Sequence, residues 1–315
     1  MKVVITGYYP ESAKRSIRES FPDDWELSIV QPDAVIGELE TADVLIPEHV
    51  QVNAALLRAA PELKLVQTGA GYDNVNLEDC TRCGVQVCNA AGINTNAVAE
   101  HVMAFILCWY KNMIYLDGFM KAHKIDPALN YTGAELSSKT IGIIGLGSVG
   151  RAVAAYCGAF GMNILGYSRN GDAPTGVQPR TLDELIRESD VISLHVPLTA
   201  DTRYMINGEV LQKMKGDALL INTSRGAVIR ESELVQALRD GQIGGACLDV
   251  YEDEPLRADH PLRNLEHVIL TPHTAGYPDG VKYHRKRYAF FVRNIKRVLR
   301  HETPECQLNR IGGGA

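Results

Sequence analysis

The sequence predicts an α/β protein with two doubly wound parallel-sheet domains. Short apolar runs alternate with helical patterns from the first residues onward, which is typical of repeated strand–helix units. A glycine-rich turn separates a strand from a helix near the middle of the chain, within a second unit of this kind. The length of 315 residues exceeds the usual size of one open domain and leaves room for both.

The first predicted domain is flavodoxin-like and begins with residues 1–98. Strands are expected at 3–6, 26–30, 44–46, 63–67 and 85–88, and helices at 11–21, 52–60 and 77–83. This domain has no glycine fingerprint of its own. Residues 285–315 are expected to return to it, because a basic amphipathic helix is predicted over 281–300.

The glycine turn predicts a Rossmann domain over residues 99–284 that binds a dinucleotide. In order, the chain carries a strand at 141–144, then Gly145, Gly147 and Gly150 at GxGxxG spacing, a helix at 148–160 and a strand at 163–167. The glycines permit a tight turn, close approach of a pyrophosphate to the backbone, and close packing of helix on strand. Ser148 and Val149 open the helix whose N-terminus would face the phosphates.

The end of the next strand indicates which dinucleotide is bound. NAD-specific sites usually place Asp or Glu about 20 residues past the glycines, where it accepts hydrogen bonds from the ribose hydroxyls. In this chain Ser168 takes that position and Arg169 follows it. A hydroxyl and a guanidinium could bind a 2′-phosphate, and no carboxylate repels it. We therefore expect NADP(H) to be favoured over NAD(H), although a solvated Ser-Arg turn is the alternative interpretation.

A long apolar segment at 97–120 joins the two predicted domains. Its large apolar residues are Val102, Phe105, Ile106, Trp109, Tyr110, Ile114, Leu116 and Phe119, with few charges between them. A helix that is apolar on most sides must be buried. The segment therefore predicts a domain junction or a subunit interface.

Composition argues against several other classes of protein. The net charge of −6 provides no basic face for nucleic acid. No stretch of about 18 apolar residues lacks charges, so no membrane span is expected, and the opening residues resemble a strand rather than a signal peptide. Seven unevenly spaced cysteines fit a reduced, cytoplasmic protein. Cys80 and Cys83 have no second pair nearby, so we expect a short helix there and no metal site.

Three candidate catalytic residues follow predicted strands late in the chain. Arg225, Glu254 and His273 come after strands predicted at 218–222, 245–249 and 268–270. Ligands of open α/β sheets bind beyond the carboxyl ends of strands. Each residue alone has an ordinary structural interpretation as a surface ion pair, a solvated acid or a loop histidine. Together they could bind a substrate carboxylate, donate a proton to a carbonyl oxygen and favour the protonated imidazole.

With these residues in place, the chain resembles the D-isomer-specific 2-hydroxyacid dehydrogenase family along nearly its whole length. The matching segments are 69–75, 94–101, GAELSSKTIGIIGLGSVG (133–150), 195–199, INTSRGAVI (221–229), GGACLDVYEDEPL (244–256) and TPHTAG (271–276). Ser168 and Arg169 depart from the NAD-type pattern and resemble the glyoxylate/hydroxypyruvate reductase branch. The resemblance therefore implies hydride transfer between NADP(H) and a small 2-keto or 2-hydroxy acid.

The resemblance also implies a role for each site residue. Arg225 would bind the substrate carboxylate, His273 would be the general acid–base, and Glu254 would be its partner. Backbone N–H groups of Ala70 and Gly71 would bind the substrate carboxylate from the first domain. The remaining cofactor contacts would be Asp249, Thr223 and Gly276 on the nicotinamide side, and Val196, Pro197, Thr199 and Thr202 on the adenosine side. Family members are commonly dimers through the cofactor domain, which would explain the apolar segment.

Other functions compatible with the same fold stay open. Formate dehydrogenases usually carry Gln where Glu254 stands, so Glu254 argues against them. Phosphoglycerate dehydrogenase is an alternative, although no C-terminal regulatory domain is recognised, and phosphite dehydrogenase would use the same fold. A cofactor-sensing protein resembling the C-terminal-binding corepressors would keep the same three residues. The substrate side chain is not predicted, because loops such as Tyr8–Tyr9 and 47–50 would shape its pocket.

Overall fold

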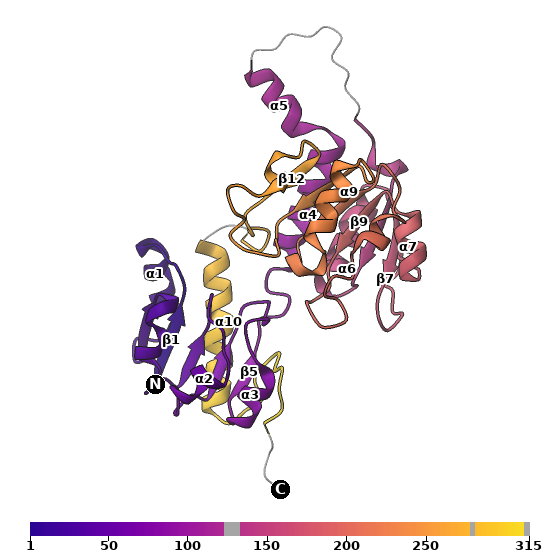
Figure 1. The fold of residues 1–315 in the computed structure, drawn as a ribbon. Helices are drawn as coiled ribbons and strands as arrows, with labels where there is room; N and C mark the ends of the chain where they lie inside the picture. Colours follow the sequence, from indigo (N-terminus) through magenta and orange to yellow (C-terminus); the bar gives the residue numbers. More distant parts are fainter. Residues whose placement is uncertain (123–132, 278–280, 312–315) are drawn as a thin grey trace. The chain divides into compact units, whose positions relative to one another are not determined.

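The computed structural model describes residues 1–122, 133–277 and 281–311, without the side chains of 281–284 (Figure 1). The chain forms two compact units, Met1–Asn94 with Asp279–Ala315, and Thr95–Pro278. The domain limits expected at 98/99 and 284/285 would fall inside helices α4 (Thr95–Tyr110) and α10 (Val281–Leu299). Each of these helices belongs to one unit over its described length, so the chain passes between units at the helix starts.

The first unit is a five-stranded sheet in which every pair of neighbours is parallel. Its strands are β1 (Lys2–Thr6), β2 (Glu26–Val30), β3 (Val44–Ile46), β4 (Leu65–Gln67) and β5 (Gln86–Cys88), in the order β2-β1-β3-β4-β5. This is the flavodoxin-like order, which confirms the predicted fold of the first domain. The helical elements are α1 (Glu11–Arg18), η1 (Pro32–Glu38), α2 (Ala54–Arg58), α3 (Leu77–Arg82) and α10.

The C-terminal helix α10 completes the core of this first unit. Tyr288 and Phe291 of α10 are fully buried and pack in one cluster with Ile17 of α1 and with strand residues such as Ile5. The C-terminal helix therefore packs in the first unit through its apolar face.

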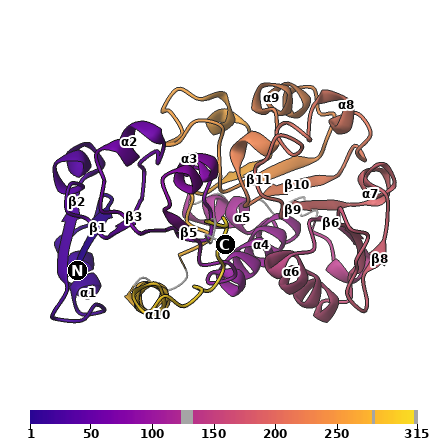
Figure 2. The ribbon, with the colours of Figure 1, turned by 90° about the horizontal axis from the view of Figure 1, so that it is seen from below.

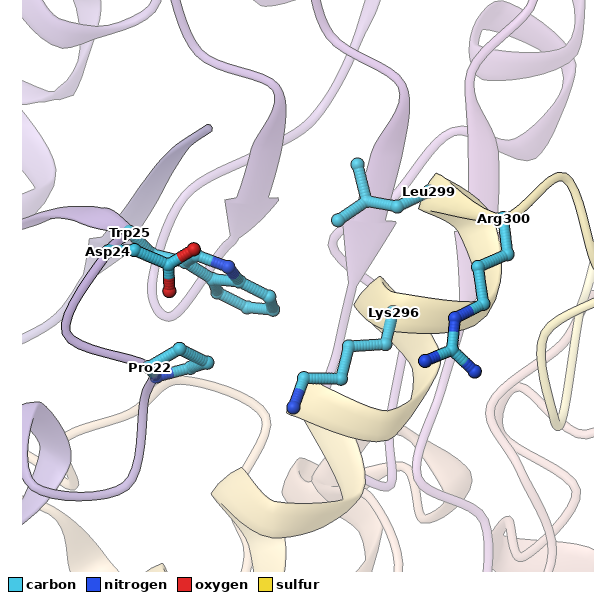
Figure 3. A pocket seen from close by; sticks show the side chains of 6 residues that line it. All are labelled: Pro22, Asp24, Trp25, Lys296, Leu299 and Arg300. Atoms are coloured by element: carbon cyan, nitrogen blue, oxygen red, sulfur yellow. The ribbon is translucent and has the colours of Figure 1, made fainter.

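A shallow hollow of about 270 Å³ lies at the amino end of β2 and the last turns of α10 (Figure 3). Its lining residues are Pro22, Asp24, Trp25, Lys296, Leu299 and Arg300. Ligands of parallel sheets bind at the opposite, carboxyl edge. The hollow is therefore not part of the candidate site.

The second unit is a seven-stranded parallel sheet of Rossmann type. Its strands are β6 (Thr140–Ile144), β7 (Asn163–Tyr167), β8 (Gln178–Pro179), β9 (Val191–Leu194), β10 (Leu219–Asn222), β11 (Gly245–Leu248) and β12 (Val268–Leu270), in the order β12-β11-β10-β9-β6-β7-β8. The order reverses between β9 and β6, which creates a topological switch point beside the glycine turn. This arrangement confirms the Rossmann prediction.

Helices cover both faces of this sheet (Figure 2). On one face, α4 and α6 (Ser148–Ala159) pack against Ile141, Ile143 and Ile221. On the other face, α7 (Leu182–Glu188), α8 (Gly208–Leu211) and α9 (Glu231–Arg239) pack around residues such as Ile144 and Leu220. Neighbouring strand residues thus enter opposite cores, which explains why these strands are continuous apolar runs. The short helices η2 (Leu136–Ser138), η3 (Gly226–Val228) and η4 (Pro261–Asn264) complete the unit.

The apolar segment at 97–120 differs from the expectation of one buried segment. It forms two helices, α4 and α5 (Met113–Lys121), separated at Asn112, which has a left-handed φ of 54°. Most apolar side chains of α4, such as Val102, Phe105 and Ile106, are buried within its own unit, and Leu107 and Trp109 are partly buried against the same core. By contrast, α5 has no buried residue, and Ile114 is 57% exposed. The predicted burial is confirmed for most of α4, whereas α5 is exposed in the single chain, so a subunit interface at α5 stays a prediction.

The described residues include no helix with the length and apolar character needed to cross a membrane. All seven cysteines are free thiols. Cys80 is buried on α3, and Cys83 is exposed where this helix ends, so the predicted short helix is confirmed. Residues 123–132 belong to the connection between α5 and η2 and lie outside the described residues, as do 278–280 and 312–315.

We predict opposite effects on stability for alanine at two helical glycines. A Cβ on Gly150 would lie 2.0 Å from the Gly145 carbonyl oxygen, so Gly150→Ala should cost about 1–3 kcal/mol of unfolding free energy. Gly118 of α5 has no atom within 4 Å of such a Cβ, so Gly118→Ala should add about 0.5–1 kcal/mol. Urea unfolding followed by circular dichroism measures both. Equal stability of Gly150→Ala and the unmodified protein would contradict the packing described here.

Candidate active site

The glycine turn joins β6 to α6 in a closely packed arrangement. Gly145 has a φ of +98°, and a Cβ there would lie 2.4 Å from the His195 carbonyl oxygen. Val196 borders the same glycine, because its Cγ1 would be 3.0 Å from that Cβ. Gly150 packs directly on the Gly145 carbonyl. A side chain at either glycine would force β6, β9 and α6 apart.

The open N-terminus of α6 has the features that a pyrophosphate requires. Gly147 is the N-cap, it provides no side-chain hydrogen bond, and nothing lies within 4 Å of where its Cβ would be. The Arg151 Nε donates to the Leu146 carbonyl at 2.9 Å and holds the turn in shape. Exposed first-turn N–H groups and the positive end of the helix dipole favour an anion. Ser148 and Val149 form that first turn, so these residues fit a dinucleotide.

Ser168 and Arg169 follow β7, but they are not equally available. The Ser168 hydroxyl donates to the Asp172 carbonyl at 2.8 Å and closes the turn that follows β7. Arg169 is exposed, and its guanidinium has no ion-pair partner in the described part of the chain. Arg169 can therefore meet a 2′-phosphate directly, whereas Ser168 must first give up a local hydrogen bond.

Two threonine side chains stabilise the loop that follows β9. The Thr202 hydroxyl donates to the Pro197 carbonyl at 2.6 Å and accepts from the Thr199 N–H at 2.8 Å. Pro197 and Thr202 therefore lie together in one turn.

Glu254 and His273 form a short hydrogen bond at the carboxyl ends of β11 and β12. The His273 Nδ1 lies 2.6 Å from the Glu254 Oε2, and the Tyr251 N–H donates to the Glu254 Oε1 at 3.1 Å. With an ionised Glu254, Nδ1 carries a proton and Nε2 is the nitrogen left to face a substrate. His273 has a left-handed φ of 53°, and its side chain is 46% exposed.

Arg225 lies close enough to this pair to act on it electrostatically. Burial of the Glu254 carboxyl favours its neutral form. The hydrogen bond from His273, the Tyr251 N–H and the positive charge of Arg225 outweigh burial, so the Glu254 pKa lies below its usual range. The structure therefore brings together all three predicted catalytic residues. Arg225 itself is oriented by donation from its Nη1 to the Ser224 carbonyl at 2.7 Å.

Asp249 is fully buried and organises the loop that carries His273. Its Oδ1 accepts from the Thr271 hydroxyl at 2.6 Å and the Thr274 N–H at 2.8 Å, and its Oδ2 accepts from the Ala275 N–H at 2.9 Å. A carboxylate accepts about four hydrogen bonds, so Oδ2 keeps room for one further donor. This geometry is compatible with the expected carboxamide contact, but it gives Asp249 a structural task that its sequence position did not reveal.

Thr223, directly after β10, has a second polar group that is available to a ligand, besides the Asp249 Oδ2. Its buried hydroxyl has no hydrogen-bond partner among the described residues. Buried hydroxyls are normally hydrogen-bonded, so an unpaired one is consistent with a polar ligand group. Gly276 follows Ala275 in the loop held by Asp249 and is partly exposed.

Ala70 and Gly71 belong to the first unit, in the loop after β4. The Ala70 carbonyl accepts from the Asn89 Nδ2 at 2.8 Å, and the Gly69 carbonyl accepts from the Ala90 N–H at 2.8 Å. The N–H groups of Ala70 and Gly71 have no acceptor among the residues that the structure describes. Two such donors in one loop fit a carboxylate.

Tyr8 and Tyr9 lie beyond the carboxyl end of β1 in the same unit. They line a hollow of about 240 Å³ together with Lys14 of α1 and residues 29–31 at the end of β2. Tyr8 is 69% exposed, so its ring is available to a ligand.

His195 is a partly buried histidine to which the sequence assigned no role. Its Nε2 lies 2.9 Å from the Ser193 hydroxyl, and removal from water lowers its pKa to about 4. The imidazole is therefore neutral at neutral pH. Because the His195 carbonyl touches Gly145, this residue supports the glycine turn through its backbone. Its position directly after an apolar strand was the only available signal.

Comparisons with known proteins place this geometry in context. Residues 103–275 match the NAD binding domain of D-isomer specific 2-hydroxyacid dehydrogenases. A glyoxylate reductase of Aeropyrum pernix is 40% identical over 93% of this chain and 94% of its own. The structure of a D-lactate dehydrogenase from Aquifex aeolicus with NAD and lactic acid is similar, with a TM-score of 0.85, 32% identity and coverage of 95% and 96%. An acyclic imino acid reductase with NADPH and D-Arg has a TM-score of 0.86, 29% identity and coverage of 98% and 100%.

We predict that His195 makes stability fall with acidification. Its folded-state pKa of about 4 is below the ordinary value of 6.5, so between these pH values the unfolded chain takes up a proton that the folded chain refuses. The free energy of unfolding should therefore decrease as pH falls from 6.5 toward 4. Urea unfolding at several pH values measures this, and His195→Gln should flatten the dependence. An unchanged dependence in that variant would contradict the assignment.

Proposed function

We propose a reaction for this chain on the premise that it belongs to the D-isomer-specific 2-hydroxyacid dehydrogenase family. It is an NAD(P)-dependent oxidoreductase of small hydroxy acids. Within this class, we infer reduction of a 2-keto acid to the D-2-hydroxy acid, with glyoxylate or hydroxypyruvate as the preferred substrate. The observation that carries the proposal is the grouping of Arg225, Glu254 and His273 at the carboxyl edge of a dinucleotide-binding sheet.

Each of the three residues has a distinct task in this reaction. Arg225 offers its planar fork to the substrate carboxylate. His273 donates the proton on Nε2 to the carbonyl oxygen as that oxygen gains negative charge. Glu254 remains ionised and holds the Nδ1 proton, which orients the ring and stabilises its positive charge. When bound, the reduced nicotinamide would supply a hydride to the carbonyl carbon, so that one hydride and one proton convert the carbonyl group to the alcohol.

The N–H groups of Ala70 and Gly71 would hold the substrate carboxylate as well. Their lack of an acceptor supports this assignment. Asp249, Thr223 and Gly276 would contact the nicotinamide, and Pro197, Val196 and Thr202 the adenosine.

A reductase screen tests the reaction. Glyoxylate, hydroxypyruvate, pyruvate, 2-ketoisocaproate and phenylpyruvate are each offered with NADPH and with NADH. We expect turnover that His273→Ala lowers about 10²–10⁴-fold without weakening cofactor binding. Arg225→Lys should raise KM, because lysine keeps the charge but loses the fork. Cofactor binding without turnover on any acid would favour a cofactor-sensing protein instead.

We further propose that NADP(H) is preferred over NAD(H). Two features support this preference: Arg169 is exposed with no ion-pair partner among the described residues, and no carboxylate directly follows β7 in the sequence. NAD-type sites need an acidic residue there to accept hydrogen bonds from the ribose hydroxyls.

We predict a graded loss of this preference. Hydrogen bonds to charged groups are worth about 1.5–3 kcal/mol, so Arg169→Ala should weaken NADPH binding about 10- to 100-fold and leave NADH binding nearly unchanged. Ser168→Asp should move the preference toward NADH, because it repels the 2′-phosphate and accepts from ribose hydroxyls. Ser168→Ala is the control that removes only the hydroxyl. Measurement of kcat/KM with NADPH and with NADH for each variant tests the prediction. A preference of the unmodified protein for NADH would refute the proposal.

We also propose a homodimer through the cofactor-binding unit. The support is α5, on which Met113, Ile114, Tyr115 and Met120 are all more than half exposed. Clustered apolar side chains of this kind mark interaction surfaces. A second copy would bury α5, whereas α4 is already covered within its own unit.

We predict that Ile114→Glu converts the dimer to a monomer, because a charge would be buried at the interface. Phe160→Glu changes an exposed apolar residue outside α5 and is the matched control. Analytical ultracentrifugation measures the mass of each. A dimer that survives Ile114→Glu would exclude α5 as its contact.

We propose a cytoplasmic location, which the seven free thiols support. Cell fractionation with a compartment marker tests it, and recovery in a membrane or secreted fraction would exclude it.

A further inference from the structure

We propose that His101 of α4 is a positioning residue that holds the loop carrying His273, acting through Thr271 and Asp249. Nothing in the pattern of the sequence assigns it this task. The proposal rests on the proposed function only in taking His273 as the proton donor. Its structural part concerns contacts within one unit and stands independently of the substrate.

The first link joins the imidazole to a hydroxyl. The His101 Nε2 lies 3.1 Å from the Thr271 hydroxyl, which donates to the Asp249 Oδ1 at 2.6 Å. A hydroxyl has one hydrogen and two lone pairs. Because that hydrogen is committed to the carboxylate, Thr271 receives the Nε2 proton of His101. The donors therefore point in one direction, from His101 to Thr271 to Asp249.

The second link joins Asp249 to the loop on both sides of the proton donor. The Asp249 carboxylate accepts from the Thr274 and Ala275 N–H groups, and the Asp249 carbonyl accepts from the His273 N–H at 2.8 Å. Three consecutive backbone donors thus end on a single residue. A shift of the Asp249 side chain would move the backbone next to His273.

The loop needs this support because its conformation is unfavourable. His273 has a φ of 53°, and the left-handed region is unfavourable for a residue other than glycine. Such a conformation persists only where its surroundings hold it. The hydrogen bonds to Asp249 provide that restraint, and the Tyr251 hydroxyl adds donation to the Thr271 carbonyl at 2.9 Å.

His101 is itself held in place and kept neutral. Its ring stands edge-on to Phe105, with centroids 4.5 Å apart and planes at 83°. α4 is packed against the sheet of its own unit, so the backbone that carries the imidazole is held in place. Burial lowers the His101 pKa more than the Asp249 charge raises it, which favours the neutral ring that donates through Nε2. A rigid donor on a buried helix can thereby fix a loop about 170 residues further along the chain.

Simple packing is the competing explanation, and a double-mutant cycle separates the two. Both His101→Leu and Thr271→Val remove the hydrogen bond between these residues, and Thr271→Val also removes the donation to Asp249. If His101 acts through Thr271, adding His101→Leu to Thr271→Val therefore has no further effect. If each residue only fills space, the effects add. His101→Gln distinguishes further, because its amide can donate to Thr271 whereas leucine cannot. Glu100→Gln changes the exposed neighbour on α4 and is the matched control.

The first measurement needs no substrate or cofactor. Hydrogen exchange by NMR reports the protection of the Thr274 and Ala275 amides, which should fall about 10-fold in His101→Leu, the loss expected for one hydrogen bond, and at least as much in Thr271→Val, which loses two. Protection should recover in His101→Gln, and Glu100→Gln should match the unmodified protein. Unchanged protection in His101→Leu would overturn the proposal even if no keto acid were reduced.

The second measurement uses the best substrate from the reductase screen. We expect His101→Leu to lower kcat about 10-fold with little change in KM for the keto acid, because Arg225 is untouched. The double variant should be no worse than Thr271→Val alone. Additive losses, near 100-fold together, would overturn the proposal, as would failure of His101→Gln to restore kcat. Absence of turnover in the unmodified protein would refute the proposed function, and amide protection would then decide alone.

Discussion

The carboxylate of Asp249 has to be satisfied by hydrogen bonds, because an ionised group without partners is very costly in a protein interior. The donors that satisfy it come from Thr271, Thr274 and Ala275, so the requirements of one buried charge determine the course of the loop that carries His273. From that loop follow the left-handed conformation of His273, its short contact with Glu254, and the presentation of Nε2. The chemistry of the site thus depends on an interaction that takes no direct part in it.

Parallel topology explains why residues so far apart in sequence meet. Each strand of the second sheet ends at the same edge, so the segments after β10, β11 and β12 deliver Arg225, Glu254 and His273 to one place. The reversal of strand order between β9 and β6 opens the glycine turn at that edge. Close packing then leaves little freedom: Gly145 and Gly150 have no space for a side chain, whereas Gly147 faces open space. Closely packed and open glycines therefore occur within six residues. The packed glycines let the helix contact the strands, and the open glycine leaves space for a ligand.

Much of this architecture could be predicted from local patterns. Apolar runs indicated the strands, the GxGxxG spacing indicated the turn, and residues at strand ends indicated Arg225, Glu254 and His273. The exposure of α5 could not be predicted in this way, because hydropathy does not show where Asn112 interrupts a helix or what covers each half. The partners of Asp249 were missed for a different reason: they involve backbone N–H groups, which every residue except proline carries. His101 lies 170 positions from Thr271, and no periodicity connects them.

The chain leaves the first unit after Asn94 and returns to it at Asp279, so the second unit is continuous in sequence while the first is split around it. During synthesis, every strand of the first sheet emerges before the second unit, but Tyr288 and Phe291, which complete its core, emerge after it. The second unit can therefore fold on the ribosome as soon as it is complete, whereas the first must wait with exposed apolar surface for its last helix. The domain made first is finished last, and a chain truncated before α10 would leave the ribosome with that surface uncovered.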